Sequence, residues 1–236
     1  MFVAFQGETN MTFTNFLRKS LPVCALLAQA AGAATIIQSN GNSGGSVPLG
    51  YYAPYAPNNT PIVYAVEWTQ TAAFTNIDVT ANLFTPGSPG TVNYALVTAL
   101  GAGTTFAADG IIRGSATTPA NPANVDLFHL ASLGPGTYFL VLDSPVANTS
   151  WQYNFPITGN YTMANGVAFD GDQMSSASSI NASYTPGSSF FGVGLPVEFA
   201  VTGTATPEPA TFGLLAMALA GVWIGQRLYG RLEKVS

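Results

Sequence analysis

Side chains alternate between two faces in FTNIDVTANL, the stretch that spans residues 74–83. One face carries Thr75, Ile77, Val79, Ala81 and Leu83, and the other carries Asn76, Asp78, Thr80 and Asn82. Because successive side chains of a strand point to opposite sides, this period of two predicts a half-buried β-strand.

The same reasoning extends to both sides of this stretch. Gly- and Pro-containing breakers separate short apolar or alternating runs, and no convincing capped amphipathic helix lies among them. The sequence therefore predicts an all-β body, a mostly antiparallel β-sandwich or jelly roll. Residues 38–46, rich in Gly, Ser and Asn, are predicted to be flexible instead. The further predicted strands lie within residues 62–69, 92–100, 126–133, 134–143 and 197–202.

Charge is scarce in this chain of 236 residues, of which only 7% are charged. Six Lys and Arg stand against eleven Asp and Glu, so no basic face for nucleic acid is expected. A single Cys can form neither a disulfide framework nor a Cys-rich metal site. Between residues 35 and 206 there are eight acids and one basic residue, Arg113, which gives a net charge near −7.

The N-terminal segment has the three parts of a secretory signal peptide. Arg18 and Lys19 precede an apolar run at residues 21–31, and Ala31 and Ala33 form an Ala-x-Ala site. We expect cleavage after Ala33 or Ala34, so that residues 1–34 form the signal.

An N-terminal anchor or a core helix is the alternative to this signal, and the signal itself allows two variations. Translation could start at Met11, because residues 1–10 add nothing that a signal needs. Lipidation at Cys24 is disfavoured, because only four residues separate it from Lys19 and Val23 is not small.

The C-terminal segment has an equally ordered layout. Pro207, Glu208 and Pro209 precede an apolar run at residues 210–225, and the cations Arg227, Arg231 and Lys234 follow it. The run is slightly short of the ~20 residues that a spanning helix prefers. Cations on one side only predict that the end is cytoplasmic and the bulk of the chain is outside. A simple membrane anchor behind a Pro linker is the alternative.

This end resembles the PEP-CTERM sorting signal. The matching features are the motif Pro207-Glu208-Pro209, the apolar segment and the basic tail, which is more dilute here than a tight Arg run. The resemblance implies export through the Sec machinery, transient anchoring in the inner membrane and processing by an exosortase. It also implies delivery to the cell surface or the extracellular matrix, with exopolysaccharide as a possible associate. Residues 207–236 are therefore expected to form the sorting segment and residues 35–206 the exported body.

A second resemblance concerns the body. Residues 133–142, LGPGTYFLVL, are similar to a strand pattern, Leu-x-Pro-Gly-x-Tyr-x-Leu, of bacterial extracellular β-sandwich domains. The pattern is short, and it supports the fold class without implying a ligand.

Residues that could carry catalysis are few. His129 is the one histidine, and on a strand Asp126 would point to the opposite face from it. A zinc site lacks ligands, and no Gly-x-Ser-x-Gly elbow precedes a helix. We therefore expect His129 to be structural and the protein not to be an enzyme; a secreted hydrolase is the least favoured alternative.

Binding residues are better represented. Asp170 and Asp172, separated by one Gly, could offer carboxylate oxygens to Ca²⁺, although a simple polar turn is the preferred interpretation. No other cofactor is expected. Trp151 and Tyr153, near Asn148, Asn154 and Asn160, could stack on and bond to sugar rings, although core packing explains aromatic residues at least as well. The sequence thus favours a structural or interaction role, with a lectin-like carbohydrate-binding module as the alternative.

Overall fold

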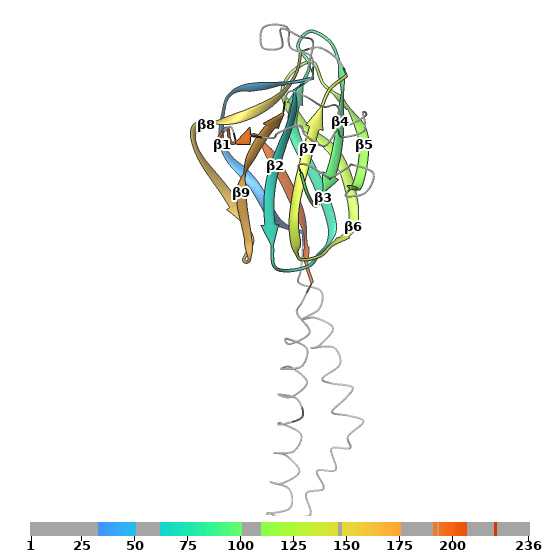
Figure 1. The fold of residues 1–236 in the computed structure, drawn as a ribbon, viewed down its shortest axis with the longest axis vertical. Helices are drawn as coiled ribbons and strands as arrows, with labels where there is room; N and C mark the ends of the chain where they lie inside the picture. The colour runs from blue at the N-terminus through green and yellow to red at the C-terminus, as the bar shows by residue number, and fades with distance from the viewer. Residues whose placement is uncertain are drawn as a thin grey trace, which may run out of the picture.

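The structure, a computed structural model, describes residues 33–50, 62–100, 110–145, 148–175, 191–192, 194–206 and 220. These residues form two antiparallel sheets that lie face to face, which confirms the predicted all-β class (Figure 1). The described residues contain no helix long and apolar enough to cross a membrane. The two predicted terminal helices lie outside the described residues, apart from Ala220 and the last signal residues, and the jelly-roll connectivity stays a prediction.

Strands account for most of the described chain. One sheet has the order β11-β1-β8-β3-β6, and the other has the order β10-β9-β2-β7-β4-β5. The strand bounds are β1 Ala34–Leu49, β2 Val63–Gln70, β3 Phe74–Phe84, β4 Gly90–Val97, β5 Gly110–Thr118, β6 Ala123–Leu133, β7 Gly136–Asp143, β8 Thr149–Met163, β9 Val167–Ser175, β10 Phe191–Gly192 and β11 Phe199–Ala205.

The core lies between the two sheets, and aromatic side chains link them. Trp68 on β2 and Trp151 on β8 are both completely buried. The Trp68 ring lies 6.4 Å from that of Phe199 on β11, and the Trp151 ring meets Tyr64 edge-on at 5.8 Å. Each pair joins one sheet to the other, because β2 belongs to the six-stranded sheet and both β8 and β11 to the five-stranded one. Offset and edge-on ring contacts of this kind add to the stabilisation from apolar burial.

The six-stranded sheet is apolar on both of its faces. Along β2, Tyr64 and Val66 enter the core between the sheets, while Val63 and Ala65 are buried on the other side. This explains why residues 62–66 form a continuous apolar run, which is typical of a strand buried on both faces. The second cluster consists of Val63, Ala65, Ala95, Val97, Phe139 and Val141.

Two details of the sequence prediction are wrong. Asn76 on β3 has a positive φ of 51°, which shifts the alternation by one position, so Phe74 rather than Thr75 joins Ile77 in the core. Residues 38–46 are not a flexible segment: they belong to β1, which pairs with β11 on one side and β8 on the other. The pairing with β11 ends at Gln38, so the ladder with β8 fixes the rest of this segment despite its Gly-rich composition.

The first and last strands of the body lie side by side. β1 and β11 pair antiparallel, with Ala34 opposite Gly203 and Thr35 opposite Thr202. The backbone nitrogen of Thr206 then donates to the carbonyl of Ala73 at 2.9 Å. The chain therefore enters and leaves the body at the same end, which Figure 1 shows at the bottom.

Candidate functional site

A polar pocket of about 210 Å³ opens on the outer face of the five-stranded sheet. Its position follows from the strand alternation, because Val79, Ala81 and Val197 are buried in the core. The residues that follow each of them, Thr80, Asn82 and Glu198, therefore face outward and line the pocket. The lining residues are Gln38, Ser39 and Gly41 of β1, Thr80 and Asn82 of β3, Asn124 of β6, Asn154 of β8, and Glu198, Phe199 and Ala200.

The pocket forms where β11 and β8 follow one another along the same edge of β3. β3 pairs with β11 over most of its length, but at Leu83 it pairs with β8 instead. Glu198 lies at this junction: its backbone nitrogen donates to Gln152 O at 2.8 Å, and its carbonyl accepts from Asn82 N at 3.0 Å. β8 and β11 diverge at this junction, so the regular ladder of backbone hydrogen bonds along β3 is interrupted. Polar side chains surround the opening that results.

Ser39 and Gly41 shape the wall of the pocket that β1 forms. Ser39 Oγ accepts from Phe199 N at 2.9 Å and donates to Phe199 O at 3.2 Å, which ties β1 to the start of β11. Gly41 has a φ of +140°, and a Cβ there would lie 3.1 Å from Cβ of Asn154. A side chain at position 41 would therefore press on Asn154 and strain the backbone as well.

Two acceptors in this pocket lack hydrogen bonds. The Asn82 amide donates to Glu198 Oε2 at 2.6 Å, which leaves its carbonyl oxygen pointing elsewhere. Within the described residues, Asn82 Oδ1 and Asn154 Oδ1 are buried without any partner. The Asn154 side chain is only 3% exposed. A buried polar atom without a partner costs about 1–3 kcal/mol, so each of these two oxygens would be stabilised by a hydrogen-bond donor.

The predicted glycan contact of Trp151 is wrong. Its side chain is completely buried, and its Nε1 donates to Glu198 O at 2.8 Å, so no sugar ring can stack on it. The Tyr153 ring is half-buried and packs against the core beside Gly45. Of the nearby asparagines, Asn154 does line a pocket, whereas Asn148 lies before β8 with a positive φ of 67°.

The predicted polar turn at Asp170 and Asp172 is wrong, whereas Ca²⁺ binding there stays a prediction. Both residues belong to β9, which has a register shift opposite Glu67 and Trp68, and their carboxylates have different partners. Asp170 is exposed and accepts from Thr69 Oγ1 at 2.5 Å. Asp172 is buried and accepts from the Tyr64 hydroxyl and from Leu195 N, the latter at 3.0 Å.

Two tyrosines lie near the buried Asp172 carboxylate. Burial, the hydrogen bond to Asp172 and its charge all raise the pKa of Tyr64 far above its ordinary value of 10.0. Burial and the same charge raise the pKa of Tyr161. Both hydroxyls therefore stay protonated at neutral pH, and Tyr64 acts as a hydrogen-bond donor.

His129 contacts Asp78 and not Asp126. Its Nδ1 meets Asp78 Oδ1, because Asp78 on β3 lies opposite His129 on β6 in the register. Both side chains are exposed to solvent. Pairing across strands brings together residues 51 positions apart, which spacing along one strand could not reveal.

Most of the predicted processing residues lie outside the described part of the chain. Pro207, Glu208 and Pro209, the tail cations Arg227, Arg231 and Lys234, and Ala31 lie beyond the described residues. Ala33 is the first described residue, and β1 begins at Ala34, at the predicted cleavage region.

One carboxyl on the outer face of the six-stranded sheet makes a pH-dependent contribution to stability. Burial, then the charge of Asp170, raises the pKa of Glu67 above 4.5, while a hydrogen bond from Gln173 lowers it. The folded state thus holds the proton more tightly than the unfolded chain. Folding is favoured by this group below about pH 4.5, and that contribution is lost as pH rises through the folded pKa.

We therefore expect Glu67→Gln to be more stable than the natural chain at neutral pH. The advantage should shrink as pH falls below the ordinary Glu value, because the natural side chain is then neutral too. Urea unfolding at a series of pH values measures this difference. Asp170→Asn, which removes only the neighbouring charge, should give a smaller effect. A stability difference that does not change with pH would contradict this assignment.

Comparison with protein-family models, curated proteins and solved structures finds no match for this chain. The chemistry of the pocket is accordingly argued from its own residues.

Proposed function

We propose that this chain is an exported cell-surface or extracellular-matrix protein with a structural or interaction role. The observation that carries the proposal is the position of the boundaries of the body. Residues 34–205 supply both sheets and the core between them, and Ala34 and Gly203 pair at one end of the body. Segments attached before and after the body therefore leave it from the same end, which would let both reach one membrane.

The order of the C-terminal segment supports processing. In the sequence, Pro207 and Pro209 disfavour a helix and favour an extended chain before the apolar run. Such a sequence suits recognition by an enzyme such as an exosortase. The apolar run holds the chain at the inner membrane after transfer by the Sec machinery, and the cations keep its end in the cytoplasm.

A non-catalytic role agrees with the chemistry of the pocket. Glycoside hydrolysis needs two carboxyl groups on either side of the bond that is broken. The described lining of the pocket contains the single carboxylate of Glu198, which already accepts from Asn82, and otherwise amide, hydroxyl and backbone groups. Such groups bind ligands through hydrogen bonds without activating a nucleophile.

Intact-mass spectrometry of the exported protein tests the proposal. The expected species begins at Ala34 or Thr35 and lacks the tail from about Pro207 onward. Replacing both Pro207 and Pro209 by Ala should leave the tail attached and the protein in the membrane fraction. The matched control is Pro86→Ala, in the exposed turn between β3 and β4, which should be processed normally. Export of a species that retains residues 207–236 would exclude exosortase processing.

A further inference from the structure

The pocket on the five-stranded sheet presents acceptors that need a donor. Asn82 Oδ1 and Asn154 Oδ1 are buried and unpartnered within the described residues, and both residues line the pocket. Both oxygens are covered by protein, so a ligand meets them only when the amide turns about its Cβ–Cγ bond toward the opening. A ligand that satisfies them must then bring hydroxyl or N–H groups, or must be a cation. The hydroxyl and amide groups of Ser39, Thr80 and Asn124 lie around the same opening.

We propose that this pocket binds one sugar unit of a neutral glycan, with Asn82 and Asn154 accepting hydrogen bonds from its hydroxyl groups. This inference deepens the proposed interaction role and rests on it, because an exported protein meets such polymers outside the cell. Sugar hydroxyls both donate and accept, so the amide nitrogens and hydroxyls of the lining can bond to the same ring.

The size and charge of the pocket favour a sugar over a metal ion. A volume of about 210 Å³ equals that of roughly seven waters at about 30 Å³ each. Ca²⁺ prefers six to eight oxygens, usually with several carboxylates among them. Glu198 is the one carboxylate among the described lining residues, and its Oε2 accepts from Asn82. A neutral polyol matches this amide-rich lining better than a divalent ion does.

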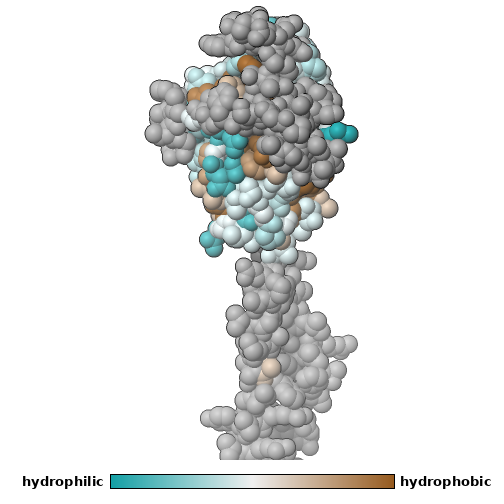
Figure 2. All heavy atoms as spheres, viewed as in Figure 1, coloured by the Kyte–Doolittle hydropathy of each residue, from teal (hydrophilic) through white to brown (hydrophobic). Residues whose placement is uncertain are grey.

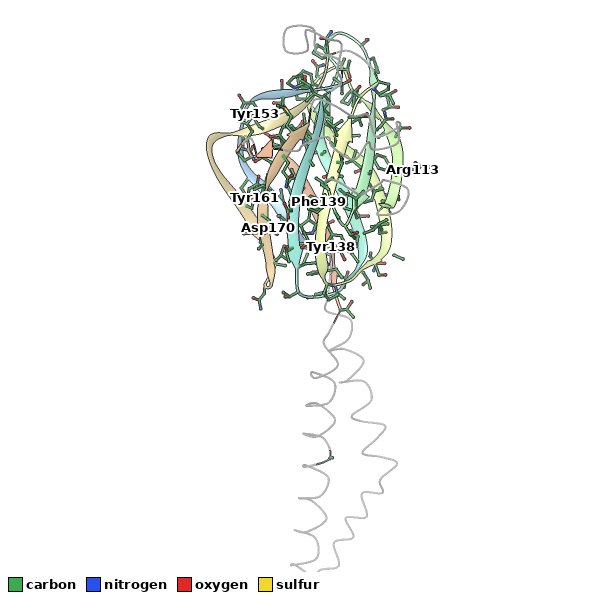
Figure 3. All side chains as sticks on the ribbon, viewed as in Figure 1. Arg113, Tyr138, Phe139, Tyr153, Tyr161 and Asp170 are labelled. Carbon is green, nitrogen blue, oxygen red and sulfur yellow. The ribbon has the colours of Figure 1, made fainter. Side chains whose placement is uncertain are left out.

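The surrounding charges favour a neutral sugar over an acidic one. Asp78 and Asp126 lie on the same outer face as Glu198, since both alternate with core residues of β3 and β6. Among the described residues, the one Lys or Arg is Arg113, on β5 of the other sheet. Figure 3 shows Arg113 at the edge of that sheet, far across it from Asp170. A uronate therefore meets repulsion at the pocket and finds no cation to offset it.

The absence of an exposed aromatic ring from the lining has a further consequence. Phe199 is the one aromatic residue among the described lining residues, and its side chain is buried in the core. Recognition then relies on hydrogen bonds alone, and the low affinity of one site would be raised by many copies along a repeating polymer.

The test uses the full chain in detergent, with affinity electrophoresis through gels that contain a neutral glucan, mannan or galactan, or a polyuronate. Migration should be retarded by at least one neutral polymer and not by the polyuronate. Asn154→Leu should weaken this retardation at least about tenfold, the loss expected for one hydrogen bond of about 1.4 kcal/mol. Leu has a similar branched shape and leaves no buried acceptor, so thermal stability should be kept or raised.

Asn40→Ala is the matched control. Asn40 lies on β1 two residues from Gln38, is exposed, donates to Thr162 Oγ1 at 2.6 Å and does not line the pocket. This variant should bind the polymer like the natural chain. If Asn154→Leu does not fold, Asn82→Ala at the half-buried acceptor replaces it, with the same loss expected.

Three results would overturn the inference. These are no retardation by any of the neutral polymers, equal retardation of Asn154→Leu and the natural chain, or stabilisation of the natural chain by Ca²⁺ that Asn154→Leu abolishes. Mass spectrometry of the exported species separates these failures from failure of the proposed function. If the protein is trimmed as expected but binds no glycan, the proposed export role stands and the glycan inference fails. If an untrimmed protein binds glycan, the inference about the pocket stands and the proposed processing fails.

Discussion

Trp151→Ala is expected to lower the free energy of unfolding by about 3–5 kcal/mol, the usual loss for a large buried aromatic residue. The side chain is 0% exposed, packs edge-on against Tyr64 and donates from Nε1 to Glu198 O. The substitution leaves a cavity between the two sheets and removes one of the two hydrogen bonds that the Glu198 carbonyl accepts at the strand junction. Urea unfolding of the full chain measures the change.

An exposed apolar residue provides the control for this change. Ile111 on β5 is 42% exposed, and Ile111→Ala should alter stability by less than about 0.5 kcal/mol. A loss below about 1 kcal/mol for Trp151→Ala would contradict its place in the core. The variant is therefore a test of the fold, and loss of binding in it would not identify a sugar contact.

Gly50→Ala is expected to destabilise the protein by roughly 2–5 kcal/mol, from backbone strain and overpacking together. Gly50 has a φ of +71°, and a Cβ there would lie 2.0 Å from the backbone oxygen of Ser144. Its backbone also exchanges two hydrogen bonds with Ile62, at 2.8 and 2.9 Å. The clash can be relieved only by moving backbone, so this contact between β1 and the start of β2 should weaken. Thermal unfolding followed by circular dichroism measures the loss.

A substitution at Gly87 separates backbone strain from overpacking. It has a similar φ of +86°, but a Cβ there would have nothing within 4 Å. Gly87→Ala should therefore show the backbone strain alone, roughly 1–2 kcal/mol. Equal losses in the two variants would contradict the close approach of Gly50 to Ser144.

The strands that the sequence predicted are those with regular alternation or strong apolar character. β2, β3, β4, β6, β7 and β11 each overlap a predicted run, and Pro-containing breakers at residues 85–89 and 119–122 lie between strands. In these segments every second residue is apolar because it faces the core, or nearly every residue is apolar because the strand is buried on both faces. The pattern can therefore be recognised in the sequence of a single strand.

β1 was missed because its glycines serve packing rather than flexibility. A Cβ at Gly45 would lie 2.5 Å from the hydroxyl of Tyr153, which faces it across the ladder. The small residue makes room for a ring from β8, a strand more than a hundred residues away. Composition alone cannot distinguish such a glycine from one in a linker, because the reason for it lies in another part of the chain.

The pocket could not be predicted for a similar reason. Its lining comes from β1, β3, β6, β8 and the start of β11, and no two of these segments form a motif along the sequence. Asn154 was noted only as a neighbour of Trp151, the residue that proved to be buried. The available signal was the excess of amide side chains at outward positions, as at Asn82 and Asn124, where the charged residues usual on a sheet surface are scarce.

This scarcity of charge is visible on the surface as well. Figure 2 shows the described part of the near face as mostly pale, weakly polar residues, with a few strongly hydrophilic patches and several brown, hydrophobic ones. A surface with so few charges suits contact with neutral polymers, and salt should have little influence on it.

We propose above all that residues 35–206 form the exported body and that both flanking segments are removed. The intact mass of the protein recovered from outside the cell tests this most directly. A single species that starts at Ala34 or Thr35 and ends near Thr206 is the predicted result. A species outside the cell that still carries residues 1–33 and 207–236 would contradict the account.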